Sequence, residues 1–325
     1  MKRSLTGIKP TGTIHVGNYL GAMRPALELV GRYDSSLYFI ADYHAMTTVQ
    51  DKQTLHSTIY DIAAAWLAAG LDPDRTLLYR QSAMLEVFEL TWIFACLVAT
   101  GQLERGHSYK DALAKGISPN AGIFNYPLLM AADIVLYDSD VVPVGRDQRQ
   151  HLEIARDVAI RFNHVFGADV LVVPEGVIQD EVLVPGTDGQ KMSKSYGNII
   201  PLFGSAKDLK KAVMGIVTAS EPLEAPKQAE GSTIFTLYQQ MAGKDKASGM
   251  QGKLAAGGYG WGHAKQDLVQ ALEDALGPMR ERYQRLRSDE VGLDRILAVG
   301  ADRARTIARA TMARVRDAIG IALRP

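Results

Sequence analysis

Two short stretches of this sequence hold side chains that could bind a polyphosphate. The first is residues 10–18, called the histidine turn here, which contains His15, Gly17 and Asn18 and lies where a strand candidate passes into a helix candidate. Free backbone N–H groups and a partial positive charge at a helix N-terminus suit a phosphate. Gly17 has no side chain, so a flat base or ribose could lie against its backbone. By itself, such a turn is equally consistent with a simple helix cap.

The second stretch, residues 188–195, is called the lysine loop here and contains Lys191, Ser193, Lys194 and Ser195. Two lysines three positions apart on a glycine-flanked loop can converge on a polyphosphate, and the serines add hydrogen-bond donors. The ordinary alternative is a solvated loop. The sequence holds no Gly-x-x-x-x-Gly-Lys-Ser/Thr motif, which excludes a P-loop as the polyphosphate site.

A lone carboxylate stands in an apolar stretch of the chain. Asp133 lies within residues 128–136, which are otherwise apolar and predict a buried helix. A buried carboxylate needs a partner, because an unpaired charge in the protein interior is costly. That partner could be an arginine or a ligand, and the side chain could also be simply exposed. The residues alone do not decide between these alternatives.

The elements that must position these side chains alternate between strands and helices over the first two thirds of the chain. Such alternation predicts a parallel sheet with helices on both faces. We therefore expect a Rossmann-like α/β catalytic domain over residues 1–204 and an all-α module over residues 205–325, whose last helix packs back on the catalytic domain. The predicted strands are residues 4–8, 37–41, 76–79, 141–144 and 170–173, and the predicted helices are residues 17–31, 55–66 and 152–162.

The composition is that of a globular protein and does not by itself indicate RNA binding. Hydrophobic residues make up 47% of the 325 residues and charged residues 22%. Lys+Arg and Asp+Glu both number 36, so a nucleic-acid partner would have to be met by local basic patches. No apolar stretch is long enough to cross a bilayer, and we expect a cytoplasmic protein. The single cysteine, Cys96, excludes a disulfide within the chain, and its apolar neighbours predict a buried thiol.

Together the two stretches resemble the paired signatures of class I aminoacyl-tRNA synthetases, a His-x-Gly-His/Asn element and Lys-Met-Ser-Lys-Ser, of which the second is matched at every residue. The resemblance implies that ATP activates an amino acid as its adenylate, with Mg²⁺ shared among the phosphate oxygens and no metal site of protein residues. It implies catalytic roles for His15, Asn18, Lys191 and Lys194. The implied ATP-binding residues are Lys9, Pro10, Thr11, Gly17, Asn18, Gly145, Arg146, Asp147, Val182, Lys191, Met192, Ser193, Lys194 and Ser195.

Over nearly its full length the chain is similar to the bacterial tryptophanyl members of this class. The segments that carry the likeness include residues 17–22, 126–134 and 142–153. The likeness implies a tryptophan–tRNA ligase that binds tryptophan and tRNA(Trp), with the Asp133 carboxylate accepting a hydrogen bond from the indole N–H. Phenylalanine lacks that donor and would leave the carboxylate unpaired, so its rejection should be strong. The implied tryptophan-binding residues are Asp133, Tyr126, Met130, Gln148, His44, Val142, Val144 and Leu5.

Three other functions stay open at this point. The tyrosine-specific enzymes of the class share the architecture but lack the Gly-Asn-Tyr element found here at residues 17–19. A non-catalytic paralogue that binds RNA or protein is kept open by the divergent residues 106–116, although the intact lysine loop argues against it. A small-molecule adenylyltransferase could share the histidine turn, but the helical module would then lack a purpose.

The C-terminal part of the chain is rich in arginine, with carboxylates interspersed. By itself this pattern favours a solvated, ion-paired surface. The resemblance implies instead an anticodon-reading module that uses phosphate contacts and stacking on exposed aromatics such as Tyr259 or Trp261. It also implies a homodimer, for which the apolar helix at residues 87–98 and the segment through Tyr126 are the interface candidates, within an insertion around residues 85–140.

Three departures from the family pattern concern the predicted site. Lys9 replaces the usual glutamine beside the polar groups of the substrate, and Leu5 replaces a common phenylalanine near the indole. Ala112 replaces a lysine near the phosphates, where Lys110 or Lys115 could substitute. We hypothesise that Lys9 retunes the binding of tryptophan and its analogues and marks an atypical or auxiliary enzyme of this type.

The variant Lys9→Gln tests this hypothesis. Because it removes a cation beside the substrate, we expect a changed KM for tryptophan and for ring-substituted analogues, measured by ATP–pyrophosphate exchange. A variant whose KM values match those of the unaltered protein would contradict the hypothesis.

Overall fold

A five-stranded parallel sheet forms the centre of the molecule. The structure, a computed structural model, describes all residues except 1, 11, 117, 146–147, 168, 179–181 and 323–325. The strand order is β3-β2-β1-β4-β5, and each neighbouring pair is parallel. The strands are β1 (Arg3–Ile8), β2 (Ser35–Ile40), β3 (Leu77–Arg80), β4 (Val141–Val144) and β5 (Glu175–Ile178).

The strand order reverses direction between β1 and β4, and open parallel sheets form a ligand crevice beyond the carboxyl ends of the strands at such a point. From β1 the chain continues to β2 and β3 on one side, and then returns to β4 and β5 on the other side of β1. The histidine turn follows β1 and Gly145 follows β4, so both segments begin at this crevice.

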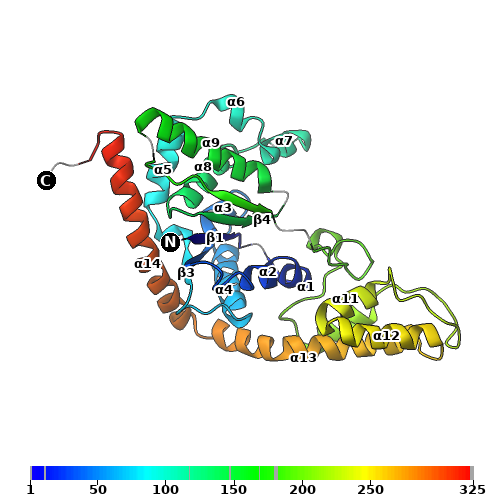
Figure 1. Cartoon of the computed structure of the whole chain (residues 1–325). Helices are drawn as coiled ribbons and strands as arrows, with labels where there is room; N and C mark the ends of the chain where they lie inside the picture. The colour runs from blue at the N-terminus through cyan, green and yellow to red at the C-terminus, as the bar shows by residue number, and fades with distance from the viewer. Residues whose placement is uncertain are drawn as a thin grey trace.

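Helices cover both faces of the sheet and then extend beyond it (Figure 1). The helical segments of the first part are α1 (Val16–Asn18), η1 (Tyr19–Met23), α2 (Arg24–Leu27), α3 (Asp42–Ala45), α4 (Lys52–Ala68), η2 (Gln81–Ala83), α5 (Glu86–Ala95), α6 (Thr100–Leu103), α7 (His107–Ala114), α8 (Ala121–Val135), α9 (Arg149–Phe166) and η4 (Lys194–Tyr196). Those of the second part are α10 (Ala206–Met214), α11 (Thr233–Ala242), α12 (Lys244–Ala256), α13 (Trp261–Arg287) and α14 (Glu290–Ala318).

Two apolar clusters fill the spaces above and below the sheet. Successive side chains of a strand point to opposite faces. Tyr38 and Ile40 of β2 therefore join the cluster shared with α4 and α13, whereas Leu37 and Phe39 join the cluster shared with α5, α8 and α9. Both faces of β2 are buried, which explains why its sequence reads as a continuous apolar run.

The last helix covers the outer edge of the sheet. Figure 1 shows α13 along the lower edge of the molecule, starting near α11 and α12, and α14 turning up along the left edge past β3 toward α5. The contact of α14 with β3 is close enough that a Cβ added at Gly300 would lie 2.0 Å from the carbonyl oxygen of Leu78. Only glycine fits at this point, and its small size allows the helix to lie directly on the edge strand.

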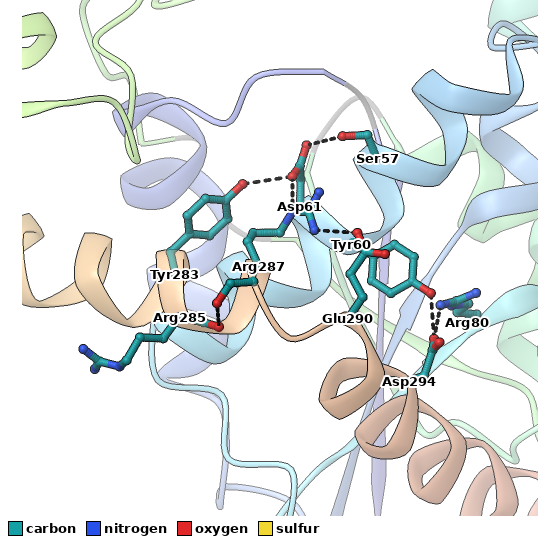
Figure 2. A network of polar contacts seen from close by, with 10 residues as sticks. Ser57, Tyr60, Asp61, Arg80, Tyr283, Arg285, Arg287, Glu290 and Asp294 are labelled. Carbon is teal, nitrogen blue, oxygen red and sulfur yellow. Dashed lines mark hydrogen bonds and ion pairs between the residues drawn. The ribbon is translucent and has the colours of Figure 1, made fainter.

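A polar network holds the junction of α13 and α14 against α4 and β3 (Figure 2). Asp61 of α4 accepts hydrogen bonds from Tyr283 Oη at 3.0 Å and from Arg287 Nε at 2.7 Å. The hydroxyl of Tyr60 donates to Asp294 at 2.8 Å, and the guanidinium of Arg80 also contacts this carboxylate. The helical module is thus attached to the sheet domain by charged hydrogen bonds, which are stronger than neutral ones.

The predicted fold class is confirmed, and four of the five predicted strands lie within one to two residues of their expected bounds. The fifth prediction, a strand at residues 170–173, is wrong: the strand is β5, Glu175–Ile178. The side chain of Asn163 binds the backbone of Leu171 in both directions, with Leu171 N donating at 2.9 Å and Leu171 O accepting at 2.8 Å. Because both polar backbone groups are occupied, this apolar run packs without joining the sheet.

Two other predictions about single residues are wrong. Cys96 is exposed, because it follows the last turn of α5, a helix whose outer face is also exposed. Trp261 is only 8% exposed and its Nε1 donates to Glu221 at 2.8 Å, so it is not a free stacking platform. Tyr259 is half-buried and its hydroxyl donates to Asp267 at 2.6 Å.

No helix among the described residues is long and apolar enough to span a membrane.

Candidate active site

The histidine turn leads into a helix that contains one wide turn. His15 precedes α1, and its backbone N–H donates to Oδ1 of Asn18 at 3.1 Å, which satisfies one free N–H at the helix start. The helix continues through the π-helical segment η1 into α2. Single π-helical turns inside a helix are frequent at functional sites. The bond from His15 uses the carbonyl oxygen of the Asn18 side chain and not its amide NH₂ group.

The histidine turn and the lysine loop, far apart in sequence, are in direct contact. The segment after the lysine loop runs antiparallel to the turn, with Val16 N donating to Ile200 O at 2.9 Å and Leu202 N donating to Ile14 O at 3.1 Å. Within the loop itself, the Sδ of Met192 accepts a hydrogen bond from Gly17 N at 3.2 Å. The structure therefore places both candidate phosphate-binding segments at one end of the crevice.

Lys194 lies against the backbone of the histidine turn. A Cβ added at Gly12, whose φ is +49°, would lie 2.9 Å from the Nζ of Lys194. Glycine is favoured there both by its positive φ and by the space that the lysine occupies. Burial lowers the pKa of the Lys194 ammonium from its usual value. An anion bound at this point would reverse that effect, since a nearby opposite charge favours the charged form.

His15 is a buried histidine that lacks a partner at one nitrogen. It is 6% exposed, and among the described residues no group bonds to its buried Nδ1. Burial, and to a lesser degree the Lys194 cation, lowers the pKa of His15 to about 4. At neutral pH the imidazole is therefore uncharged, with one donor and one acceptor nitrogen. A buried polar atom without a partner is costly, and a bound ligand could supply the missing hydrogen bond.

Asn198, which was not among the predicted residues, organises the lysine loop. The Oδ1 of this asparagine accepts from Ser193 N at 2.8 Å, and its Nδ2 donates to Asp188 Oδ1 at 2.7 Å and to Lys191 O at 3.1 Å. It is buried, and the absence of a side chain at Gly186 makes room for it. In the sequence, the only signal for this role was the Gly197-Asn198 pair shortly after the lysine loop.

The predicted specificity residue, Asp133, is buried on α8, and its described partners are a histidine and a glutamine, not an arginine. It is 2% exposed, and its Oδ2 contacts His44 Nε2 at 2.9 Å and accepts from Gln81 Nε2 at 2.7 Å. Burial is the largest cause of a raised pKa at Asp133, which the two hydrogen bonds partly offset. Gln81 is a second residue of the site that was not predicted from the sequence.

Tyr126 lies two helical turns before Asp133 on α8 and so shares a face with it. Its hydroxyl is 2.9 Å from Ser108 Oγ of α7 and also contacts Nε2 of His151 on α9. The rings of Tyr126 and His44 meet edge to face with centroids 6.1 Å apart. The predicted residues Tyr126 and Asp133 of α8 thus lie beside the predicted His44 of α3. Two residues that were not predicted, on α7 and α9, complete this polar group.

Apolar side chains of the predicted tryptophan pocket belong to one cluster. Leu5 of β1 and Val142 and Val144 of β4 are buried on the face of the sheet that α8 covers, and Met130 packs against the same cluster. Gln148 lies just before α9, where its backbone N–H donates to Gly145 O at 3.0 Å. Ordinary core packing is compatible with this arrangement, so a role in binding the indole stays a prediction.

The remaining predicted ATP-binding residues lie around the same end of the sheet. Pro10 is buried, and Lys9, Gly145 and Ser195 are exposed. The carbonyl oxygen of Val182 would be 3.5 Å from a Cβ added at Gly21, which lies in η1. Three predicted ATP-binding residues, Thr11, Arg146 and Asp147, lie outside the residues that the structure describes.

The divergent segment near the predicted site forms α7. Ala112, at the position where the family has lysine, is buried, whereas Lys110 and Lys115 are exposed. Lys9, another of the three departures, has its Nζ 3.4 Å from Thr47 Oγ1. Although the residue as a whole is exposed, partial burial of its ammonium group lowers its pKa. That Lys110 or Lys115 takes the place of the missing lysine at the phosphates stays a prediction.

Comparisons with known proteins agree with this geometry. Residues 2–277 match the family described as tRNA synthetases class I (W and Y). The tryptophan–tRNA ligase of Fusobacterium nucleatum is 46% identical over 322 residues, which cover 99% of this chain and 98% of the relative. The chain belongs to the class I tRNA synthetases of the W and Y family.

Two further members of the family support the same conclusion. The tryptophan–tRNA ligase of Bordetella pertussis is 46% identical over 330 residues, covering 98% of this chain and 73% of the relative. The crystal structure of tryptophanyl-tRNA synthetase from Campylobacter jejuni complexed with ADP and tryptophan is 42% identical, with a TM-score of 0.93 over 98% of this chain and 99% of that one. The family predicted from the two signatures is therefore confirmed.

The state of His15 gives a pH prediction for this family member. Since its pKa is lowered to about 4, the folded protein prefers the neutral imidazole. The stability that His15 contributes is fully present above the unfolded pKa of about 6.5 and is lost as pH falls from there toward 4. We expect no titration of His15 between pH 5 and 8 in proton NMR of the imidazole, and a raised midpoint with a non-hydrolysable ATP analogue. The signal is assigned by its loss in His15→Gln, and a midpoint near 6.5 without nucleotide would contradict the prediction.

Proposed function

We infer that this chain is a tryptophan–tRNA ligase, which activates L-tryptophan with ATP and transfers it to tRNA(Trp). The single observation that carries the inference is the direct contact of the histidine turn and the lysine loop. Met192 accepts a hydrogen bond from Gly17, and the side chain of Lys194 lies beside Gly12. The chain that holds this contact aligns over nearly its full length with a tryptophan–tRNA ligase. ATP, tryptophan and tRNA meet in the cytoplasm, where we place the reaction.

In the first step a carboxylate oxygen of tryptophan attacks the α-phosphorus of ATP. The bond from the α-phosphorus to the bridging oxygen breaks, pyrophosphate leaves in line, and tryptophanyl-adenylate forms. The protein has little covalent work in such a transfer, so its contribution is to position the reactants and to stabilise charge on the phosphates. We assign this task to the neutral His15, the amide of Asn18, and the cations of Lys191 and Lys194.

Magnesium enters with the nucleotide in this proposal. Among the described residues, no three histidine, cysteine or acidic side chains are grouped so that they could hold a metal ion. The donors that do surround the candidate phosphate site are cationic or neutral, and they fit phosphate oxygens better than a cation. A Mg²⁺ ion would therefore be bound by the phosphate oxygens of the substrate, where it neutralises their charge.

Recognition of tryptophan depends on the buried Asp133. A carboxylate with 2% exposure must keep its hydrogen bonds, and an indole N–H would satisfy an acceptor that phenylalanine would leave empty. Tyr126 and Gln148 would hold the ammonium and carboxylate of the amino acid. The buried Leu5, Val142 and Val144, with Met130, would form the wall against the indole ring.

In the second step a hydroxyl of the terminal ribose of tRNA attacks the carbonyl carbon of the adenylate, and AMP leaves. We assign anticodon recognition to the all-α module over residues 205–325. Most C-terminal arginines with described contacts bind the sheet domain: Arg282 donates to Ala68 O, and Arg316 forms two hydrogen bonds with Glu89. Candidates for RNA phosphates are therefore the exposed Arg285 and Arg295, for which no side-chain bond is described.

A homodimer would bury the outer face of α5. Leu85 is 71% exposed and Trp92 is 72% exposed, and Phe88 lies between them. Spacings of three and four place all three side chains on one face of the helical segment. Large exposed apolar groups that gather in one patch mark protein interfaces. Because the patch would be symmetric in a two-fold dimer, we propose a second copy of this chain as its partner.

Pyrophosphate exchange with parallel amino acids tests the activity. We expect exchange with tryptophan and far less with tyrosine or phenylalanine. Lys194→Ala should lower kcat/KM for tryptophan by roughly 30- to 1000-fold, about 2–4 kcal/mol, because it removes a contact to the developing charge. Lys210→Ala, an exposed lysine on α10, should leave the rate unchanged. Equal rates for tyrosine, or an inactive unaltered protein, would favour the tyrosine-specific enzyme or a non-catalytic paralogue.

The dimer proposal is tested by light scattering at micromolar concentration. We expect a dimer for the unaltered protein and a monomer for Trp92→Glu, because a charge buried at the centre of the patch is costly. Ile160→Glu places the same charge on another exposed apolar position, on α9, and should stay dimeric. A monomeric unaltered protein would rule the proposal out.

A further inference from the structure

We propose that Gln81 is a positioning residue for amino-acid selection, which fixes the Asp133 carboxylate as an acceptor with one oxygen directed to the indole N–H. The inference rests on the proposed function and deepens it, because it assigns part of the selection of tryptophan to a residue outside the predicted site. Gln81 need not touch the substrate, since it acts through Asp133.

Gln81 occupies a rigid position behind the pocket. It opens the 3₁₀ segment η2 directly after β3, and it is 1% exposed. Its Nε2 donates to Oδ2 of Asp133 at 2.7 Å, a bond between buried side chains that lie 52 positions apart in sequence. A hydrogen bond to an ionised partner in such surroundings is among the stronger ones in proteins.

The opposite end of the Gln81 side chain sets the orientation of its amide. Its Oε1 faces the start of α3 and accepts from Tyr43 N at 3.1 Å and from His44 N at 3.4 Å. Because backbone N–H groups only donate, they hold the carbonyl oxygen on their side and turn the NH₂ group toward Asp133. Neither a carboxylate nor an apolar side chain of this length could accept at one end and donate at the other.

Both described bonds of Asp133 go to the same oxygen. His44 Nε2 lies 2.9 Å from Oδ2, which also accepts from Gln81, and within the described part of the chain no donor bonds to Oδ1. The Oδ1 atom is therefore the acceptor that a ligand N–H can use. Gln81 has a second bond that holds its donor in place, because its own carbonyl oxygen is bound by α3.

The donors also decide whether Asp133 can accept at all. Burial raises the pKa of Asp133, and the neighbouring Asp42 carboxylate raises it further, whereas the bonds from His44 and Gln81 lower it. A protonated Asp133 would offer an O–H donor where the indole also offers a donor. Loss of the Gln81 bond would thus weaken recognition of the N–H specifically, while the apolar wall of the pocket would stay in place.

The test compares tryptophan with its sulfur isostere, 3-benzothienylalanine, which has nearly the same shape but no ring N–H. In Gln81→Glu the side chain keeps its length and its acceptor for α3, but it loses the donor and adds a charge beside Asp133. We expect kcat/KM for tryptophan in pyrophosphate exchange to fall about 10- to 100-fold, carried by KM, since bonds to charged groups contribute about 1.5–3 kcal/mol. The value for the isostere should change by less than about threefold.

The readout is the ratio of the two substrates on one preparation, which does not depend on how much of the protein is folded. Gln81→Met, which removes the donor without adding a charge, should lower this ratio in the same direction if Gln81→Glu fails to fold. Ser82→Ala is the matched control, because the backbone N–H and hydroxyl of Ser82 bind Asp42 and not Asp133. The ratio in this control should equal that of the unaltered protein.

Each failure has its own signature. No exchange by the unaltered protein with tryptophan would overturn the proposed function itself. Exchange without preference for tryptophan over the isostere would overturn the role of Asp133. If the unaltered protein shows the preference and both Gln81 variants retain it, or lose both substrates in equal proportion, Gln81 is only structural and the present inference is wrong.

Discussion

A short antiparallel pairing holds the two phosphate-binding segments together, and the rest of the candidate site is arranged around it. Ile14 and Val16 bond to the chain at Ile200 and Leu202, so the histidine turn and the lysine loop share a backbone frame. Flexible lysine side chains could not by themselves keep two distant loops at one anion. The rigid pairing leaves only Lys191 and Lys194 to adapt, which matches a reaction whose demands are position and charge.

The amino-acid end of the crevice is constrained by the cost of burying a carboxylate. Asp133 lies on a helix that packs in an apolar cluster, and its stability there depends on donors from η2 and α3. These donors come from segments directly after β3 and β2. They therefore lie at the carboxyl ends of the strands, where the histidine turn follows β1. The parallel arrangement thus brings acceptor, donors and phosphate-binding groups to one side of the molecule.

Features of the fold and the site that leave a local pattern could be predicted from the sequence, and features that depend on distant partners could not. Strands buried on both faces, such as β2, stand out as apolar runs, and the two signatures were matched residue by residue. The run at residues 170–173 looked the same, but the Asn163 side chain occupies the backbone of Leu171 and excludes it from the sheet. Gln81 and Asn198 act through hydrogen bonds to distant partners, and a lone amide side chain carries no local pattern that reveals them.

The packing of α14 on β3 has a consequence for how the protein folds during its synthesis. Leu78 and Gly300 touch, although most of the chain separates them. A ribosome releases the strand long before it releases the helix, so the backbone edge of β3 must wait with its carbonyl and amide groups uncovered. Contacts between such distant segments also slow folding. The C-terminal helix therefore acts as the closing element of the nascent domain, and loss of that helix would leave a strand edge open to aggregation.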